Sequence, residues 1–130
     1  MQNMSGGKSA IGLDANVAAL IGYPISIVAL ILIFIEKDNK FVRFHAIQSV
    51  IWSIGIIVAV IAVAIVGTII SLVLSAVSGT LATLVGLIFM LVYVGLLLGL
   101  LGGIIYGAIK AYGGEMTKLP IVGSMAEKWA

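Results

Sequence analysis

The polar side chains best suited to chemistry recur at helical spacing just after residue 44. A residue advances by about 100° around a helix, so they share one side of it, within about 140° of arc. They are His45, Gln48, Ser49, Trp52 and Ser53. An ionisable side chain that faces inward in a membrane helix is a candidate for proton transfer. We favour the alternative, a structural role in which His45 and Gln48 bond to backbone groups or nearby carboxylates.

The preceding residues contain a cluster of charge in a chain that has very little. The five charged residues of this cluster are Glu36, Lys37, Asp38, Lys40 and Arg43. By contrast, residues 44–109 contain no Asp, Glu, Lys or Arg. A charge at the centre of a bilayer costs about 2.5–3.5 kcal/mol on insertion scales. The cluster therefore predicts where one membrane-spanning helix ends and the next begins.

Enzyme and metal chemistry find little support in the sequence. The chain has one histidine and no cysteine, so it lacks the ligand sets typical of zinc sites and any cysteine nucleophile. No nucleophile–base pair, paired carboxylates or phosphate-binding loop is recognisable. We predict no enzymatic activity, no catalytic residue, no cofactor and no metal site. The net charge of +2 gives no reason to expect nucleic-acid binding.

The composition indicates that lipid surrounds most of these residues. Hydrophobic residues make up 62% and charged residues 9%, against about 25% charged in a typical soluble domain. About 20 apolar residues are needed to cross the hydrocarbon core. Residues 14–35 satisfy this, and polar residues between 75 and 83 divide the long uncharged segment into 44–74 and 81–110. The prediction is one all-α integral membrane domain with three transmembrane helices, followed by a short cytoplasmic or interfacial segment, residues 111–130.

The positions of lysine and arginine favour three membrane helices over four. With three helices, the N-terminus shares a face with the turn near residues 75–83, and that face carries only Lys8. The other cations then lie on the opposite face, whereas four helices would remove this asymmetry. The positive-inside rule places the charged turn and the C-terminus in the cytoplasm of a multi-pass protein of the cell (plasma or inner) membrane. The cations on that face either bind anionic lipids or only determine topology.

Glycine recurs every four residues in the last predicted helix, at Gly95, Gly99, Gly103 and Gly107. Glycine at this spacing allows the backbone of another helix to approach closely in lipid. We predict a helix-packing groove of the glycine-zipper kind between two helices of the same chain. Self-association through the groove is the alternative, and a glycine-lined pore is a third interpretation.

Three pieces of sequence also suggest a family. They are LDANVAALIGY at residues 13–23, EKDNKFVRFHAIQS at 36–49 and YGGEMTKLPIVGSMAEK at 112–128. Together they resemble small uncharacterised prokaryotic membrane proteins grouped with the twenty-kilodalton chloroplast inner-envelope import component (the Tic-twenty-like family). The resemblance implies a helical bundle without known enzymatic activity and, for the plastid protein, a part in a protein-conducting channel. The motif positions carried over are Asn16, Tyr23, Glu36, Phe41, Arg43, His45, Gln48, Glu115, Pro120 and Glu127.

The function that these observations predict is a non-enzymatic membrane protein that scaffolds, or helps to assemble or translocate, components of a prokaryotic membrane. The alternative is an oligomeric channel or carrier for a small solute, an ion or a polypeptide. The predicted partners are the bilayer, anionic lipids, and a second copy or another membrane protein. Because the charged turn and the tail share a face, Arg43 or Lys40 is expected to face Glu115 or Glu127.

Overall fold

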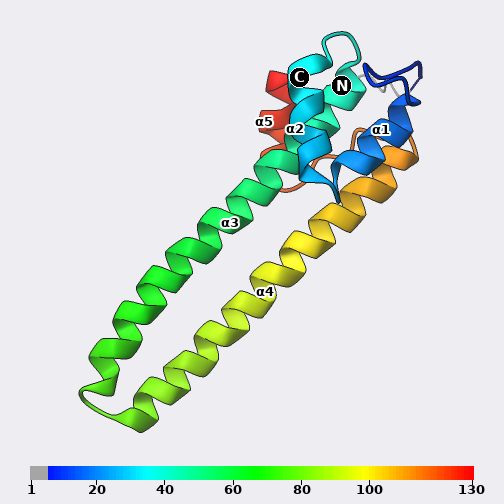
Figure 1. Cartoon of the computed structure of the whole chain (residues 1–130). Helices are drawn as coiled ribbons and strands as arrows, with labels where there is room; N and C mark the ends of the chain where they lie inside the picture. The colour runs from blue at the N-terminus through cyan, green and yellow to red at the C-terminus, as the bar shows by residue number, and fades with distance from the viewer. Residues whose placement is uncertain (1–5) are drawn as a thin grey trace. The chain divides into compact units, whose positions relative to one another are not determined.

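The computed structural model describes residues 6–130 and confirms the all-α class (Figure 1). Its helices are α1 (Ala15–Gly22), α2 (Ser26–Ile35), α3 (Lys40–Ser75), α4 (Gly79–Tyr112) and α5 (Val122–Trp129). They fall into two compact units. Unit 1 holds the described residues up to Ser53 together with Leu101–Ala130, and unit 2 is Ile54–Leu100. Helices α3 and α4 contribute to both units.

Unit 2 consists of two antiparallel helical arms, residues 54–75 of α3 and 79–100 of α4 (Figure 1). Each arm is about 33 Å long at 1.5 Å per residue, which matches a hydrocarbon core of about 30 Å. The arms approach closely at Gly67, where an added Cβ would lie 3.0 Å from Phe89 Cδ1. Both α3 and α4 are long and apolar enough to cross a membrane.

Residues 14–35 do not form the single spanning helix that their length predicts. Helix α1 ends at Gly22 and α2 begins at Ser26, because Pro24 has no N–H group to continue the helical hydrogen bonds and the backbone of Ile25 is extended, with φ −116° and ψ 90°. At about 12 Å and 15 Å, neither helix reaches across the hydrocarbon. The chain instead turns back at once, and a Cβ at Gly22 would lie 3.6 Å from Ala29 Cβ. A third spanning helix is therefore not confirmed.

The segment before α1 lies against the charged turn that follows α2. The Ala10 amide donates to Glu36 Oε2 at 2.6 Å, and Asn39 Nδ2 donates to the Gly6 carbonyl at 3.3 Å. The three-helix arrangement puts these two segments on opposite faces of the membrane. Groups that bond directly cannot be separated by a bilayer, so the contacts are incompatible with that arrangement.

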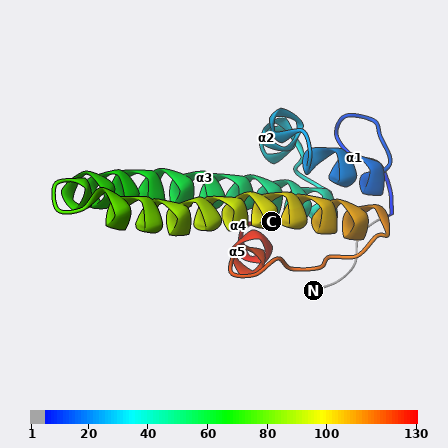
Figure 2. The same ribbon diagram turned by 90° about the horizontal axis from the view of Figure 1, so that it is seen from below.

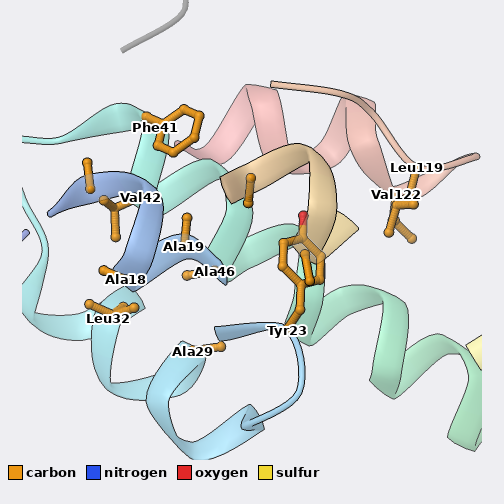
Figure 3. Packing of buried hydrophobic residues seen from close by; sticks show 13 residues of the cluster. Ala18, Ala19, Tyr23, Ala29, Leu32, Phe41, Val42, Ala46, Leu119 and Val122 are labelled. Atoms are coloured by element: carbon orange, nitrogen blue, oxygen red, sulfur yellow. The ribbon is translucent and has the colours of Figure 1, made fainter. Parts of the chain in front are cut away.

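Alanine-rich packing forms the core of unit 1. Small side chains on α1, such as Ala15, Ala18 and Ala19, are almost fully buried. Figure 3 shows Ala18 and Ala19 beside Val42 and Ala46 of α3. The small residues let the short helices approach closely. Such residues are common where helices associate by van der Waals packing and not by the hydrophobic effect.

Local sequence signals explain where the long helices begin and end. Asn39 precedes α3, and its Oδ1 accepts hydrogen bonds from the Phe41 and Val42 amides at 3.1 Å and 3.3 Å, which is N-capping geometry. After α4, Gly114 adopts a positive φ of 80°, and the Glu115 amide bonds back to the Lys110 carbonyl at 2.9 Å. A glycine in this position is the usual way to end a helix.

The glycine repeat of α4 does not form one groove within the chain, so the predicted glycine zipper is not supported. An added Cβ would collide with the Trp52 ring at Gly103 and with the Tyr23 ring at Gly107. At Gly95 or Gly99 it would meet no atom within 4 Å. The reason is helical geometry: each step of four residues turns by about 400°, so the face drifts by about 40° per glycine. Only the last two glycines still face a neighbour.

This difference yields a test within one helix. We expect Gly103→Ala and Gly107→Ala to lower the free energy of unfolding by about 1–3 kcal/mol, because the new methyl group overlaps an aromatic ring. The matched control is Gly99→Ala, which should be neutral or stabilising by up to about 1 kcal/mol through helix propensity. The measurement is unfolding in a mild detergent. Equal loss of stability in all three variants would contradict the packing described here.

Candidate functional site

The candidate residues of α3 are brought together in a buried polar cluster, which we define as Tyr23, His45, Gln48 and Ser49. All four side chains are 0% exposed. Helix α3 supplies three of them, and Tyr23 comes from the turn between α1 and α2. Residues 115–119, between α4 and α5, contribute backbone groups. The cluster thus joins three segments of unit 1 that are distant in sequence.

Gln48 uses its whole side-chain amide inside this cluster. Its Nε2 donates to the Tyr23 hydroxyl at 2.8 Å and to the Thr117 carbonyl at 3.0 Å. Its Oε1 accepts from the Leu119 amide at 2.8 Å. Both N–H groups and the carbonyl oxygen therefore have partners, as a buried amide requires.

The partners of His45 define its protonation state. Its Nε2 lies 2.8 Å from the Glu115 carbonyl oxygen, which can only accept, so Nε2 carries a hydrogen. Its Nδ1 lies 2.7 Å from the Tyr23 hydroxyl. That hydroxyl already accepts from Gln48 and has one hydrogen left to donate, which goes to Nδ1. The geometry is fully satisfied by neutral His45 with its hydrogen on Nε2.

Aromatic rings enclose the imidazole. The centroids of Phe41 and Phe44 lie 4.7 Å and 5.0 Å from the centroid of His45, and both rings meet it edge to face. A proton relay needs a route to water or to a second titratable group, whereas both nitrogens here bond to internal partners. The arrangement favours the structural interpretation of His45 over proton transfer.

The remaining members of the predicted polar face have packing roles. The Ser49 hydroxyl donates to the Gly22 carbonyl at 2.9 Å, which ties α3 to the end of α1. Trp52 covers Gly103, and Ser53 is half-buried. The structure thus brings Ser49 into the cluster and leaves Ser53 outside it.

Arg43 connects the end of α2 to the end of α5. Its Nη1 donates to the Ile33 and Glu36 carbonyls at 2.9 Å and 2.7 Å, and its Nε donates to the Ala130 carbonyl at 3.3 Å. The last carbonyls of a helix have no partner within it and carry partial negative charge, so a guanidinium group suits them.

Arg43 thus contacts the tail, as expected for the charged turn, but through backbone carbonyls and not through the expected Glu115 or Glu127 carboxylate. Glu115 instead pairs with Lys110 at 3.4 Å, and Glu127 pairs with Lys118 at 2.8 Å. The Lys118 ammonium lowers the pKa of Glu127. Sequence reasoning assigned Arg43 a carboxylate because orphan carbonyls at a helix end leave no mark in the sequence.

The other motif positions lie at contacts between segments of unit 1. Asn16 Nδ2 donates to the Tyr112 carbonyl at 3.0 Å. The Glu36 carboxylate, which is 3% exposed, accepts from the Asn39 amide at 3.2 Å as well as from Ala10. Pro120 is exposed, and its carbonyl accepts from the Val122 amide at 2.7 Å. Asn39 was missed, although an asparagine before a helix is a recognisable capping signal.

The Tyr23 hydroxyl offers a clean test of the cluster. We expect Tyr23→Phe to lower the free energy of unfolding by about 1–3 kcal/mol, because it removes the donor to His45 and one acceptor of Gln48. Tyr112→Phe is the control, since that side chain is 58% exposed and should change stability little. Thermal unfolding in detergent compares the two variants. Similar melting of both would show that the hydroxyl contributes nothing to the fold.

Comparison with known proteins shows which family the chain resembles. A model of the magnetosome magnetite crystal formation protein family matches residues 9–126. The UPF0132 membrane protein MJ1443 of Methanocaldococcus jannaschii is 32% identical over 95% of this chain and 96% of its own length. A second, MJ1527 of the same organism, is 32% identical over 92% of this chain and 73% of its own length. No solved structure matches the chain.

These matches overturn the Tic-twenty-like resemblance, because neither the family model nor the relatives point to that family. The three pieces that suggested it are the parts of unit 1 that bond to one another through Tyr23, Gln48 and the backbone of residues 115–119. By the extent of the family match and its similarity to UPF0132 membrane proteins, the chain belongs to the magnetosome magnetite crystal formation protein family.

Proposed function

We propose that this protein is a non-enzymatic membrane component that crosses the bilayer as a two-helix hairpin and organises other membrane components through unit 1. The observation that carries the proposal is the buried polar cluster. The side chains that could do chemistry, Tyr23, His45 and Gln48, are fully enclosed and bond to internal partners. A catalytic group must reach its substrate. Because these polar side chains bond to internal partners, they support a role of the cluster in stabilising the fold of unit 1.

The distribution of charge supports the two-helix topology. Every Lys, Arg, Asp and Glu of the sequence falls within the residue ranges of unit 1, and Ile54–Leu100 has none. If unit 2 spans the membrane, all seven cations lie on one face and none near the turn at residues 76–78. This asymmetry is stronger than in the three-helix arrangement. The positive-inside rule then puts the N-terminal segment, the charged turn and α5 on the cytoplasmic side of a cell membrane.

The family description refers to the formation of magnetite crystals, whereas the two relatives from Methanocaldococcus jannaschii are named only as membrane proteins. Hard metal ions and mineral surfaces are bound by free carboxylates. Most carboxylates of unit 1 are engaged internally: Asp14 with Lys8, Glu115 with Lys110, Glu127 with Lys118, and Glu36 with backbone amides. Among the described residues, no three His, Asp or Glu side chains lie close enough together to hold a metal ion, which supports a role in membrane assembly over direct contact with a mineral.

The grooves of unit 2 give little support to a channel within one chain. One groove, with a volume of about 350 Å³, is lined almost wholly by apolar side chains such as Ile57, Val60 and Leu97. A second groove is lined in part by hydroxyl groups, including Thr68, Ser71 and Thr83. A permanently hydrated path needs polar lining through the whole hydrocarbon. The apolar groove would interrupt such a path.

The topology can be tested by single cysteines, because the natural sequence has none. We expect Ala10→Cys, Lys37→Cys and Ser124→Cys to react with a membrane-impermeant maleimide from one face of the membrane, and Ala76→Cys from the other. All four side chains are exposed, so accessibility does not limit the reaction. Three spanning helices would instead group Ala10 with Ala76. That result, measured on vesicles of known orientation, would exclude the hairpin.

The scaffolding function predicts partners that depend on an intact unit 1. After extraction in mild detergent, the natural chain should co-purify with specific membrane proteins, and Tyr23→Phe should lose them while Tyr112→Phe keeps them. The natural chain running as a lone monomer would contradict the proposal. So would ion or solute flux through liposomes that contain only the purified protein, which would favour the oligomeric channel.

A further inference from the structure

Helix α2 exposes an apolar face. The residues on this face are Ile27, Leu30, Ile31, Phe34 and Ile35, of which Ile27 and Phe34 are 70% and 72% exposed. The opposite side of the helix, with Ala29 and Leu32, is buried in the core of unit 1. The only exposed polar side chain within the helix is Ser26 at its start. This helix therefore has apolar side chains on both its buried and its exposed side, and such an exposed apolar face indicates contact with a partner other than water.

Helix α5 exposes a second apolar face, formed by Ile121, Met125 and Trp129 at spacings of four residues. Their side chains are 87%, 38% and 54% exposed. The inner side of the helix, at Val122, Gly123 and Ala126, is buried. An amphipathic helix with a tryptophan at one end of its apolar face is typical of segments that lie in a membrane interface.

The backbone at Ile121 is strained, and this strain projects its side chain outward. Ile121 has φ 67° and ψ −56°, and the Val122 amide bonds to the Pro120 carbonyl at 2.7 Å, which together form a γ-turn with positive φ. This conformation is rare for a β-branched residue and costs free energy. Such strain persists where it serves a contact, and in unit 1 this side chain meets no core.

Within residues 6–130, three lysines near these faces have no carboxylate partner. Lys37 and Lys40 flank the turn after α2, and Lys128 precedes Trp129. In the part of the chain that the structure describes, each ion pair joins other residues, and Asp38 is the one carboxylate with neither an ion pair nor a hydrogen bond. Spare positive charge beside an apolar face matches the headgroups of anionic lipids.

We propose that unit 1 lies in the interface of one leaflet, with the faces of α2 and α5 at the boundary between headgroups and acyl chains and Lys37, Lys40 and Lys128 among anionic headgroups. The proposal rests on the hairpin topology above, which puts unit 1 on a single side of the membrane. The turn between α1 and α2 then lets the chain enter this interface and return to the same face without crossing the bilayer.

Lipid explains both faces better than a second protein copy does. Figure 2 shows α2 and α5 on opposite sides of α3 and α4 within unit 1. A twofold dimer covers one self-complementary patch and would leave the other face exposed. A bilayer surrounds the unit and covers both faces at once. It is also continuous with the lipid that contacts unit 2.

Depth measurements with spin labels test this inference in the full-length protein. We expect labels on Ile27→Cys, Phe34→Cys and Met125→Cys to collide readily with dissolved oxygen and poorly with an aqueous nickel chelate. The comparison site is Asp38→Cys, which should show the reverse. The experiment uses liposomes of phosphatidylcholine with added phosphatidylglycerol. Aqueous behaviour at Ile27 and Phe34 would overturn the proposal even if the cysteine labelling supports the hairpin.

The same experiment recognises a protein partner. Labels that are shielded from both relaxing agents and show spin–spin coupling would indicate a second copy on that face, which also overturns the proposal. For the lysines, we expect the natural chain to prefer spin-labelled phosphatidylglycerol over phosphatidylcholine by about fivefold per lysine. Replacing all three with glutamine should abolish this preference. The control Lys118→Gln with Glu127→Gln removes an ion pair without changing net charge and should retain it.

Discussion

The side-chain amide of Gln48 is the point on which unit 1 depends. One amide group holds the turn between α1 and α2 through Tyr23, and residues 117–119 through two backbone bonds. Inside a low-dielectric core these bonds are strong, and each group would be costly to leave unpaired. The neutral imidazole of His45 extends the same network to the Glu115 carbonyl. Around it, the small residues of α1 and the glycines at 103 and 107 allow the close approach that such short bonds require.

Part of this architecture could be predicted from the sequence, because the length of an apolar segment and the helical spacing of polar residues within it are visible there. The two long apolar helices and the polar face with His45, Gln48 and Ser49 follow from composition and helical spacing. The partners of that face could not be predicted, since Glu115, Thr117 and Leu119 contribute only backbone groups. Every residue has a backbone carbonyl and every residue except proline has an N–H group, so the residue types at these positions give no signal of the bonds. Spacing likewise could not tell which glycines of α4 meet a neighbour.

The first apolar segment shows why length alone misleads. Residues 15–35 are long enough to span a bilayer, and Pro24 on its own would only kink a spanning helix. What decides the outcome is tertiary: Gly22 lets the chain turn back against Ala29, and Glu36 receives the Ala10 amide. The distribution of lysine and arginine was interpreted with the same expectation, because assigning cations to a membrane face requires the number of spanning helices, and the structure does not confirm three. With the turn recognised, the same cations give a more consistent distribution.

The separation of the cluster along the chain has a consequence for synthesis. His45 and Gln48 are made about 70 residues before the carbonyls and amide that satisfy them, which lie in residues 115–119. While the ribosome completes unit 2, these polar groups on α3 lack their final partners, and unit 1 remains open although α1, α2 and most of α3 already exist. Proteins are made from the N-terminus, so early segments ordinarily fold first. Unit 1 therefore closes only after both arms of unit 2 have been synthesised, so its final shape depends on the completion of unit 2.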